Sequence, residues 1–213
     1  MAVHFAGGTD VVAYGGGGFS AIACIAFRFK TSGVTANTAM VSKWTSSSRQ
    51  GWGILLNNTT NKISAHGFDV SSPEKIKLIS STSVNDGNWH HVAFNYNTNN
   101  AGANALYVDG SSEATGNSSA SWNQLSNSTA PMTIGKNNDT FWAVPVMDIA
   151  EVGYFPRQLT AAEISALSKG ISPQAMGASG YWPFIADCRN FNDQFITGPT
   201  GTSVGVHPRV FGR

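Results

Sequence analysis

The stretch Asp86–Gly110, DGNWHHVAFNYNTNNAGANALYVDG, guides the interpretation of the whole chain. Within it Val92, Phe94 and Tyr96 alternate with smaller or polar residues, which is the period-two pattern of a strand with one buried face. A polar loop and a second short apolar strand follow. The stretch ends on Asp109-Gly110, a pair that readily adopts the positive φ angles of a tight hairpin turn. It therefore predicts antiparallel β-structure.

The same alternation recurs along most of the chain. Phe19–Lys30 predicts the clearest long strand, with Ile25, Phe27 and Phe29 on one face. The 213 residues suit one large β-sandwich with a sizeable core, and we find neither an internal repeat nor a second domain. Further strands are expected at residues 39–44, 51–56, 62–67, 75–80, 132–135, 146–154 and 180–188.

One short helix is expected after the strand at 146–154. Thr160 and Glu163 have the spacing of a capping box, in which each side chain bonds the backbone N–H of the other residue. Leu159 and Ile164 occupy the positions of a hydrophobic staple, and Gly170 is a natural stop. The helix should therefore begin just after Thr160 and end before Gly170.

The composition excludes several classes of protein. Charged residues make up 12% of the chain, where about 25% is usual, and 13 basic residues nearly balance 12 acidic ones. A net charge of +1 argues against a nucleic-acid partner, which calls for a basic stripe. No run approaches the roughly 18 apolar residues of a membrane span, and the start of the chain lacks the pattern of a signal peptide. Without an export signal, Cys24 and Cys188 are expected to be free thiols; the alternative is a disulfide between them that closes a long loop.

Several motifs together resemble the laminin-G-like, pentraxin-like group of concanavalin-type jelly rolls. The resemblance covers about residues 3–190 and implies an all-β fold, a two-sheet antiparallel jelly-roll sandwich with one short helix. We place the jelly-roll domain at residues 1–195 and assign residues 196–213 as a C-terminal tail that contacts other subunits. The motifs are the Gly51-Trp52 strand, the Trp89-His90-His91-Val92 strand, the Tyr107–Gly110 turn and the helix Leu159–Leu167.

No catalytic constellation is visible, so we expect no enzyme. Laminarinase-type enzymes share this jelly roll and need two carboxylates about 5–5.5 Å apart. Asp148 and Glu151 are three residues apart on an expected strand, which sends their side chains to opposite faces. His90 and His91 are adjacent, so they cannot both bind one metal ion. A nucleophile-elbow motif is also missing, although a Ser-His-Asp triad is recognised by geometry rather than by sequence.

Two kinds of binding site were considered. The resemblance implies that calcium can bind through loop oxygens, and Asp139 is then the first candidate ligand; the alternative is that the neighbouring asparagines are turn residues and that no cofactor is needed. Trp122 and Trp142 lie in polar loops, where together with Asn137 and Asn138 they could contact a sugar or a protein partner. The other tryptophans match the family's buried aromatics and are expected in the core: Trp44, Trp52, Trp89 and Trp182.

The sequence supports two functions from different classes. The first is a non-enzymatic virion protein of a tailed phage, most simply a capsid decoration or cement protein that forms a homo-oligomer and is assembled in the host cytoplasm. It rests on the low charge and on a His207-Pro-Arg end that resembles phage-encoded laminin-G-like proteins. The alternative is a lectin-like carbohydrate-binding module for host attachment, with or without calcium. Neither function involves nucleic acid or a membrane.

Overall fold

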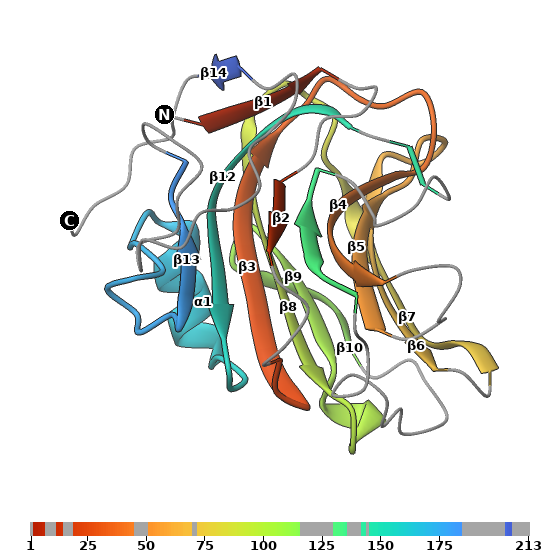
Figure 1. The fold of residues 1–213 in the computed structure, drawn as a ribbon, viewed down its shortest axis with the longest axis vertical. Helices are drawn as coiled ribbons and strands as arrows, with labels where there is room; N and C mark the ends of the chain where they lie inside the picture. Colours follow the sequence, from red (N-terminus) through yellow and green to blue (C-terminus); the bar gives the residue numbers. More distant parts are fainter. Residues whose placement is uncertain are drawn as a thin grey trace.

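The computed structural model describes residues 2–6, 12–14, 19–44, 51–69, 72–115, 130–135, 142–143, 145–184 and 203–205. Two antiparallel sheets face each other, and one short helix lies on the outer side of the first sheet (Figure 1). The predicted all-β sandwich is therefore confirmed.

The first sheet carries the hairpin predicted from Asp86–Gly110. Its described strands run in the order β10-β9-β8-β3-β12-β1-β14, and β13 pairs with β12. Their bounds are β1 Ala2–Ala6, β3 Ile22–Lys30, β8 Trp89–Asn97, β9 Ala105–Val108, β10 Ser111–Thr115, β12 Val146–Phe155, β13 Gly180–Trp182 and β14 Ser203–Gly205.

The second sheet is built mainly from consecutive strands. Its described strands run in the order β2-β11-β4-β5-β6-β7, so that β4 to β7 form a meander. Their bounds are β2 Val12–Tyr14, β4 Thr38–Trp44, β5 Gly51–Leu56, β6 Lys62–Asp69, β7 Ser72–Ser83 and β11 Met132–Ile134.

The predicted hairpin and turn are confirmed. β8 pairs antiparallel with β9, and the short 3-10 helix η1 (Ala101–Ala103) lies in the polar loop between them. Asp109 and Gly110 have φ angles of 51° and 83° and turn the chain from β9 into β10. Both angles lie in the left-handed region that a tight hairpin turn requires.

Alternate side chains of β3 belong to two different hydrophobic clusters, one on each face of the first sheet. Ile25, Phe27 and Phe29 are fully buried between the two sheets, in the main core. Cys24 and Ala26 point the other way and pack with residues of the helix and its flanks, and Cys24 is a free, buried thiol. Burial raises the pKa of the Cys24 thiol far above its ordinary value, so the group stays protonated. Cys188 lies outside the described residues.

Helix α1 (Ala161–Ser168) begins where the capping box predicts. The Thr160 hydroxyl accepts from the Glu163 N–H, and the Glu163 carboxylate accepts from the Thr160 N–H at 2.8 Å. The staple residues Leu159 and Ile164 are both buried in the cluster beneath the helix. The sequence therefore specified both the start of the helix and the face that it buries.

The edges of the two sheets are joined where β7 meets β10. The Glu113 carboxylate of β10 accepts hydrogen bonds from the backbone N–H and the hydroxyl of both Ser81 and Thr82 on β7. Burial tends to raise the pKa of Glu113, but these hydrogen bonds together outweigh it, so the pKa is lowered and the group is ionised at neutral pH. They also satisfy edge groups that would otherwise face solvent.

Three sequence expectations need correction or qualification. The strand predicted at residues 180–188 ends at Trp182, because Pro183 has no N–H to donate to a ladder. Trp89, expected in the core, is only partly buried at the start of β8, whereas Trp44, Trp52 and Trp182 are buried as expected. Residues 203–205 of the predicted tail pair with β1 as β14, and contact of the tail with another subunit stays a prediction.

Candidate functional site

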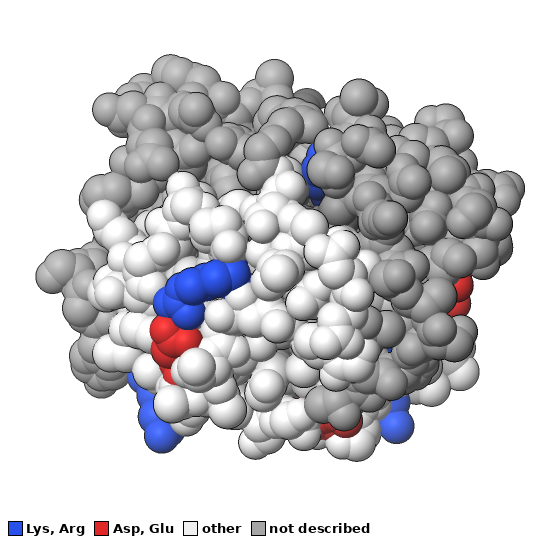
Figure 2. All heavy atoms as spheres, turned by 90° about the horizontal axis from the view of Figure 1, so that it is seen from below, with Lys and Arg blue, Asp and Glu red and all other residues white. Residues whose placement is uncertain are grey.

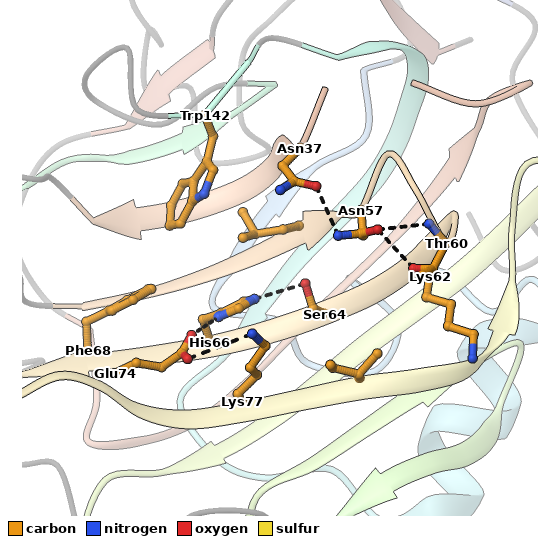
Figure 3. Close-up of a pocket in the computed structure, with 12 residues that line it drawn as sticks. Asn37, Asn57, Thr60, Lys62, Ser64, His66, Phe68, Glu74, Lys77 and Trp142 are labelled. Atoms are coloured by element: carbon orange, nitrogen blue, oxygen red, sulfur yellow. Dashed lines mark hydrogen bonds and ion pairs between the residues drawn. The ribbon is translucent and has the colours of Figure 1, made fainter. Parts of the chain in front are cut away.

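The outer face of the second sheet, turned away from the first sheet, contains a hollow of about 490 Å³ (Figure 3). This volume lies within the 300–1,000 Å³ range of small-molecule sites. We call this site the outer hollow. Its lining residues are Asn37, Leu55, Asn57, Thr60, Lys62, Ser64, His66, Phe68, Glu74, Lys77, Ile79 and Trp142.

The register of the strands forms the floor of the outer hollow. Leu55, Ser64 and Ile79 are partners across β5, β6 and β7 and form one row. Successive side chains of a strand alternate between faces, so the next outward row lies two residues away and contains His66 and Lys77. Ile79 lies on the edge strand β7 and is 46% exposed, so an apolar side chain is available to a ligand at that end of the row.

An aromatic wall closes one end of the outer hollow. The Trp142 ring lies 4.5 Å from Trp44 and 5.9 Å from Phe68, measured between ring centroids. A Cβ atom at Gly53 would lie 3.5 Å from the Trp142 ring, an ordinary van der Waals distance, so the indole lies directly over the backbone of β5. The Ala143 N–H donates to the Asn37 carbonyl at 3.0 Å, which ties the Trp142 segment to the start of β4.

A charged network lies beside this wall. His66 Nδ1 hydrogen-bonds the Glu74 carboxylate, and His66 Nε2 lies 2.9 Å from the Ser64 hydroxyl. Lys77 Nζ lies 4.0 Å from the second oxygen of Glu74. The hydrogen bond from His66 lowers the pKa of Glu74 below its ordinary value, so this carboxylate is negative at neutral pH.

The opposite end of the outer hollow carries amides and a lysine. The Asn37 side-chain carbonyl accepts from the Asn57 amide at 3.0 Å, and the Asn57 carbonyl accepts from the Thr60 N–H at 2.9 Å. These bonds hold the Asn37 and Asn57 side chains in place. Lys62 lies at the same end and has no ion-pair partner among the described residues (Figure 3).

Of the predicted binding residues, the structure places Trp142 in the outer hollow. It is only 9% exposed, so it offers an edge of its ring rather than an open stacking face. Trp122, Asn137, Asn138 and Asp139 lie outside the described residues, so the sugar-contact and calcium predictions on them stay predictions.

The sequence interpretation missed the residues that form most of this site. Lys62, Ser64 and His66 alternate along one strand, which was the available signal that this strand has a polar outward face. The pairing of His66 with Glu74 could not be foreseen, because it depends on the register of β6 against β7.

The residues considered for catalysis or metal binding lie elsewhere and apart. Asp148 bonds His4 at 2.7 Å, while Glu151 is buried and accepts a hydrogen bond from Tyr181. His90 bonds Asp109 and Asp86 at 2.8 and 3.0 Å, as expected of a satisfied edge histidine. Within the described part of the chain, no three His, Cys, Asp or Glu residues are grouped so as to hold a metal ion.

The described part of the face shown in Figure 2 offers little charge. On the face shown in Figure 2, most of the described surface is neither basic nor acidic, and the most prominent basic side chain lies against an acidic one. Among the described residues, no helix is long and apolar enough to cross a membrane.

Residues 6–165 match the family model described as the concanavalin A-like lectin/glucanases superfamily, of the laminin G type. The chain belongs to this family. The match covers the second sheet, the strands β3, β8, β9, β10 and β12 of the first sheet and most of α1, and it confirms the family inferred from the motifs. No curated protein sequence matches the chain.

Three solved structures illustrate the likeness of fold. A putative carbohydrate binding protein from Bacteroides ovatus has a TM-score of 0.71 at 11% identity, with 97% of this chain and 60% of that chain covered. A native heptameric SAP-like pentraxin from Limulus polyphemus has a TM-score of 0.57 at 15% identity, with 78% and 81% covered. Domains LG4-5 of the mouse laminin alpha1 chain have a TM-score of 0.54 at 15% identity, with 75% and 44% covered. The chain thus spans less than two thirds of the Bacteroides and laminin structures.

Proposed function

We propose that this protein is a lectin-like carbohydrate-binding module and that the outer hollow is its binding site. The observation that carries the proposal is an open hollow in which Trp142 and Phe68 meet a row of polar side chains. Sugar sites combine apolar or aromatic surface, which covers the C–H face of the ring, with a few fixed donors and acceptors for the hydroxyl groups. The family and the carbohydrate-binding description of the Bacteroides protein support this proposal.

Binding fits the outer hollow better than hydrolysis does. Two carboxylates are required by the usual mechanisms of glycoside hydrolysis. Among the described residues that line the outer hollow, Glu74 supplies the only carboxylate, and it is engaged by His66 and Lys77. Fixed amides at one end and aromatic rings at the other hold a sugar without reacting with it.

A glycan array followed by titration calorimetry tests the proposal. We expect a hit whose affinity falls at least tenfold in Ile79→Glu, because a charged side chain would replace the exposed apolar one on the β7 side of the floor. Ile22→Glu is the matched control, since Ile22 is a 38% exposed isoleucine on the first sheet. Trp142→Ala should also lose binding. An array without a hit, or equal loss in both glutamate variants, would rule out the outer hollow as a glycan site.

A structural role in a tailed-phage virion, as a decoration or cement protein, is the second candidate. The low charge of the chain, 12% of its residues, supports this role, because it leaves little charge repulsion to oppose packing against other coat proteins. Cosedimentation with purified phage shells tests this role, and light scattering tests the expected homo-oligomer. A monomer that does not bind shells would argue against it.

A further inference from the structure

We propose that the outer hollow selects anionic glycans, meaning sugars that carry a carboxylate or a sulfate group, and that Lys62 is the main residue that binds the anion. This inference rests on the proposed carbohydrate-binding function and adds the chemical class of the ligand. It starts from the balance of charge in the outer hollow, where two lysines face one carboxylate among the described lining residues.

The single negative charge of the outer hollow is already engaged. Glu74 shares a hydrogen bond with His66 and lies near Lys77, so its charge is directed toward those two partners. The Lys77 contact, at 4.0 Å, lies at the outer limit of an ion pair, and the Lys77 side chain is 49% exposed. Lys77 can therefore turn toward a ligand at little cost, because an exposed ion pair of this kind contributes under about 1 kcal/mol.

Lys62 differs from Lys77 because no described carboxylate pairs with it. It lies at the amide end of the outer hollow, beside the rim formed by Asn57 and Thr60 (Figure 3). The spacing along β6 from His66 to Lys62 is four residues, or roughly 13 Å at the rise of a strand. A ligand covering both positions is thus longer than one sugar ring.

The surrounding groups favour an acidic sugar over a free anion. Asn37 accepts through its side-chain carbonyl from Asn57, which leaves the Asn37 amide nitrogen to donate to a ligand oxygen. A lysine beside neutral amide donors suits a carboxylate or sulfate, because charge-assisted hydrogen bonds are stronger than neutral ones. The apolar floor at Leu55 and Ile79 then contacts the sugar itself. A free anion has no such apolar surface.

Titration calorimetry on the full chain distinguishes this inference from the proposed function. The probes are a hexuronate oligosaccharide, a sulfated oligosaccharide and a neutral glucan of matched length. We expect tighter binding of at least one acidic probe, and a loss of roughly 10-fold or more in Lys62→Gln, the size of one charged hydrogen bond. The same variant should change neutral-glucan affinity less than twofold. Lys169→Gln, at an exposed lysine that follows α1, is the matched control and should change nothing.

Salt gives a second readout. The affinity for the acidic probe should fall between 50 and 500 mM NaCl in the native chain, and this dependence should weaken in Lys62→Gln because one contact between charges is lost. Comparing the affinities of the hexuronate and the sulfated probe shows whether the outer hollow prefers a carboxylate or a sulfate group. Equal affinity for acidic and neutral probes, or an unchanged Lys62→Gln variant, would overturn the inference and leave the carbohydrate-binding proposal standing. No binding of any probe would overturn both.

Discussion

The outer faces of the two sheets differ in whether another part of the described structure covers them. The outer face of the first sheet is covered by α1, whose Ile164 and Leu167 pack on Cys24, Ala26 and Ala93. The outer face of the second sheet has no helix over it in the described structure, and it contains the outer hollow (Figure 1). Both sheets share one core, but the outward side chains beneath α1 are small and apolar, whereas those at the outer hollow include polar and charged ones.

The covered face shows how polar groups are handled when solvent is excluded. The Asn95 side chain donates to the Leu159 carbonyl at 2.7 Å and accepts from the Leu159 N–H at 3.0 Å. Both backbone polar groups of Leu159, just before α1, therefore have a hydrogen-bond partner. Arg28 donates to the carbonyls of Leu167 and Ser168 at 2.7 and 2.8 Å. These carbonyls belong to the end of the helix, where no further turn can satisfy them.

The open face handles its polar groups differently. Asn37, Lys62 and Lys77 remain accessible at the outer hollow, and their bonds leave capacity for further partners. We therefore expect stability to depend more on the covered face and ligand binding to depend on the open face. The comparison predicts that mutations of matched residue types will have large effects on stability on one face and on ligand affinity on the other.

The largest effect is expected for Ile164→Ala on the covered face. The substitution leaves a cavity beneath α1 and should lower the free energy of unfolding by about 2–4 kcal/mol. Ile79→Ala on the open face should cost under about 1 kcal/mol, because Ile79 is 46% exposed. Urea unfolding of the two variants measures both values. Similar losses would show that the open face is as closely packed as the covered one.

A matched pair of asparagines gives the next effect. Asn95→Ala leaves the N–H and carbonyl of Leu159 buried without their partner, at a cost of about 2–3 kcal/mol. Asn58→Ala removes one exposed bond to the Thr35 carbonyl and should cost about 0.5 kcal/mol or less. Thermal unfolding of both variants compares them. An Asn95→Ala variant as stable as the native chain would mean that water replaces the lost bonds.

The smallest effect concerns pH and lies in the hairpin that begins at Asp86. Hydrogen bonds with Asp109 and Asp86 raise the pKa of His90, although burial opposes the shift. A raised pKa means that the stabilisation is complete below about pH 6.5 and is lost as the pH rises through the folded value. Burial tends to raise the pKa of Asp109, but hydrogen bonds from His90 and His91 outweigh it, so the pKa is lowered. Hydrogen bonds from Asn88 are the main reason that the pKa of Asp86 is lowered to about 2. The contributions of the two carboxylates to stability are therefore present above about pH 4 and are lost as the pH falls below it.

The cluster should therefore stabilise the fold best between about pH 4 and 6.5. We expect His90→Gln to flatten the decline in melting temperature between pH 6 and 8. The variant should leave glycan affinity unchanged, because His90 lies on the first sheet. His4→Gln, which alters a more exposed histidine bound to Asp148, is the control. A slope that is steeper in His90→Gln than in the native chain would contradict the assignment.

The sequence by itself determined the fold class, the family, the hairpin turn at Asp109-Gly110 and the start of α1. These features depend on local signals, namely the alternation of residues in strands, the φ preferences of turn residues and the reciprocal bonds of a capping box. The division of β3 into a core face and a helix face followed from the same alternation.

Only the tertiary structure decided where the candidate site lies. The outer hollow combines residues from Asn37 to Trp142, and their proximity depends on strand order and register, which no local pattern encodes. Trp142 itself was recognised as a candidate, but its packing over β5 and beside Trp44 was not predicted. No local pattern singles out Glu74 and Lys77, which lie beside His66 only because β7 pairs with β6.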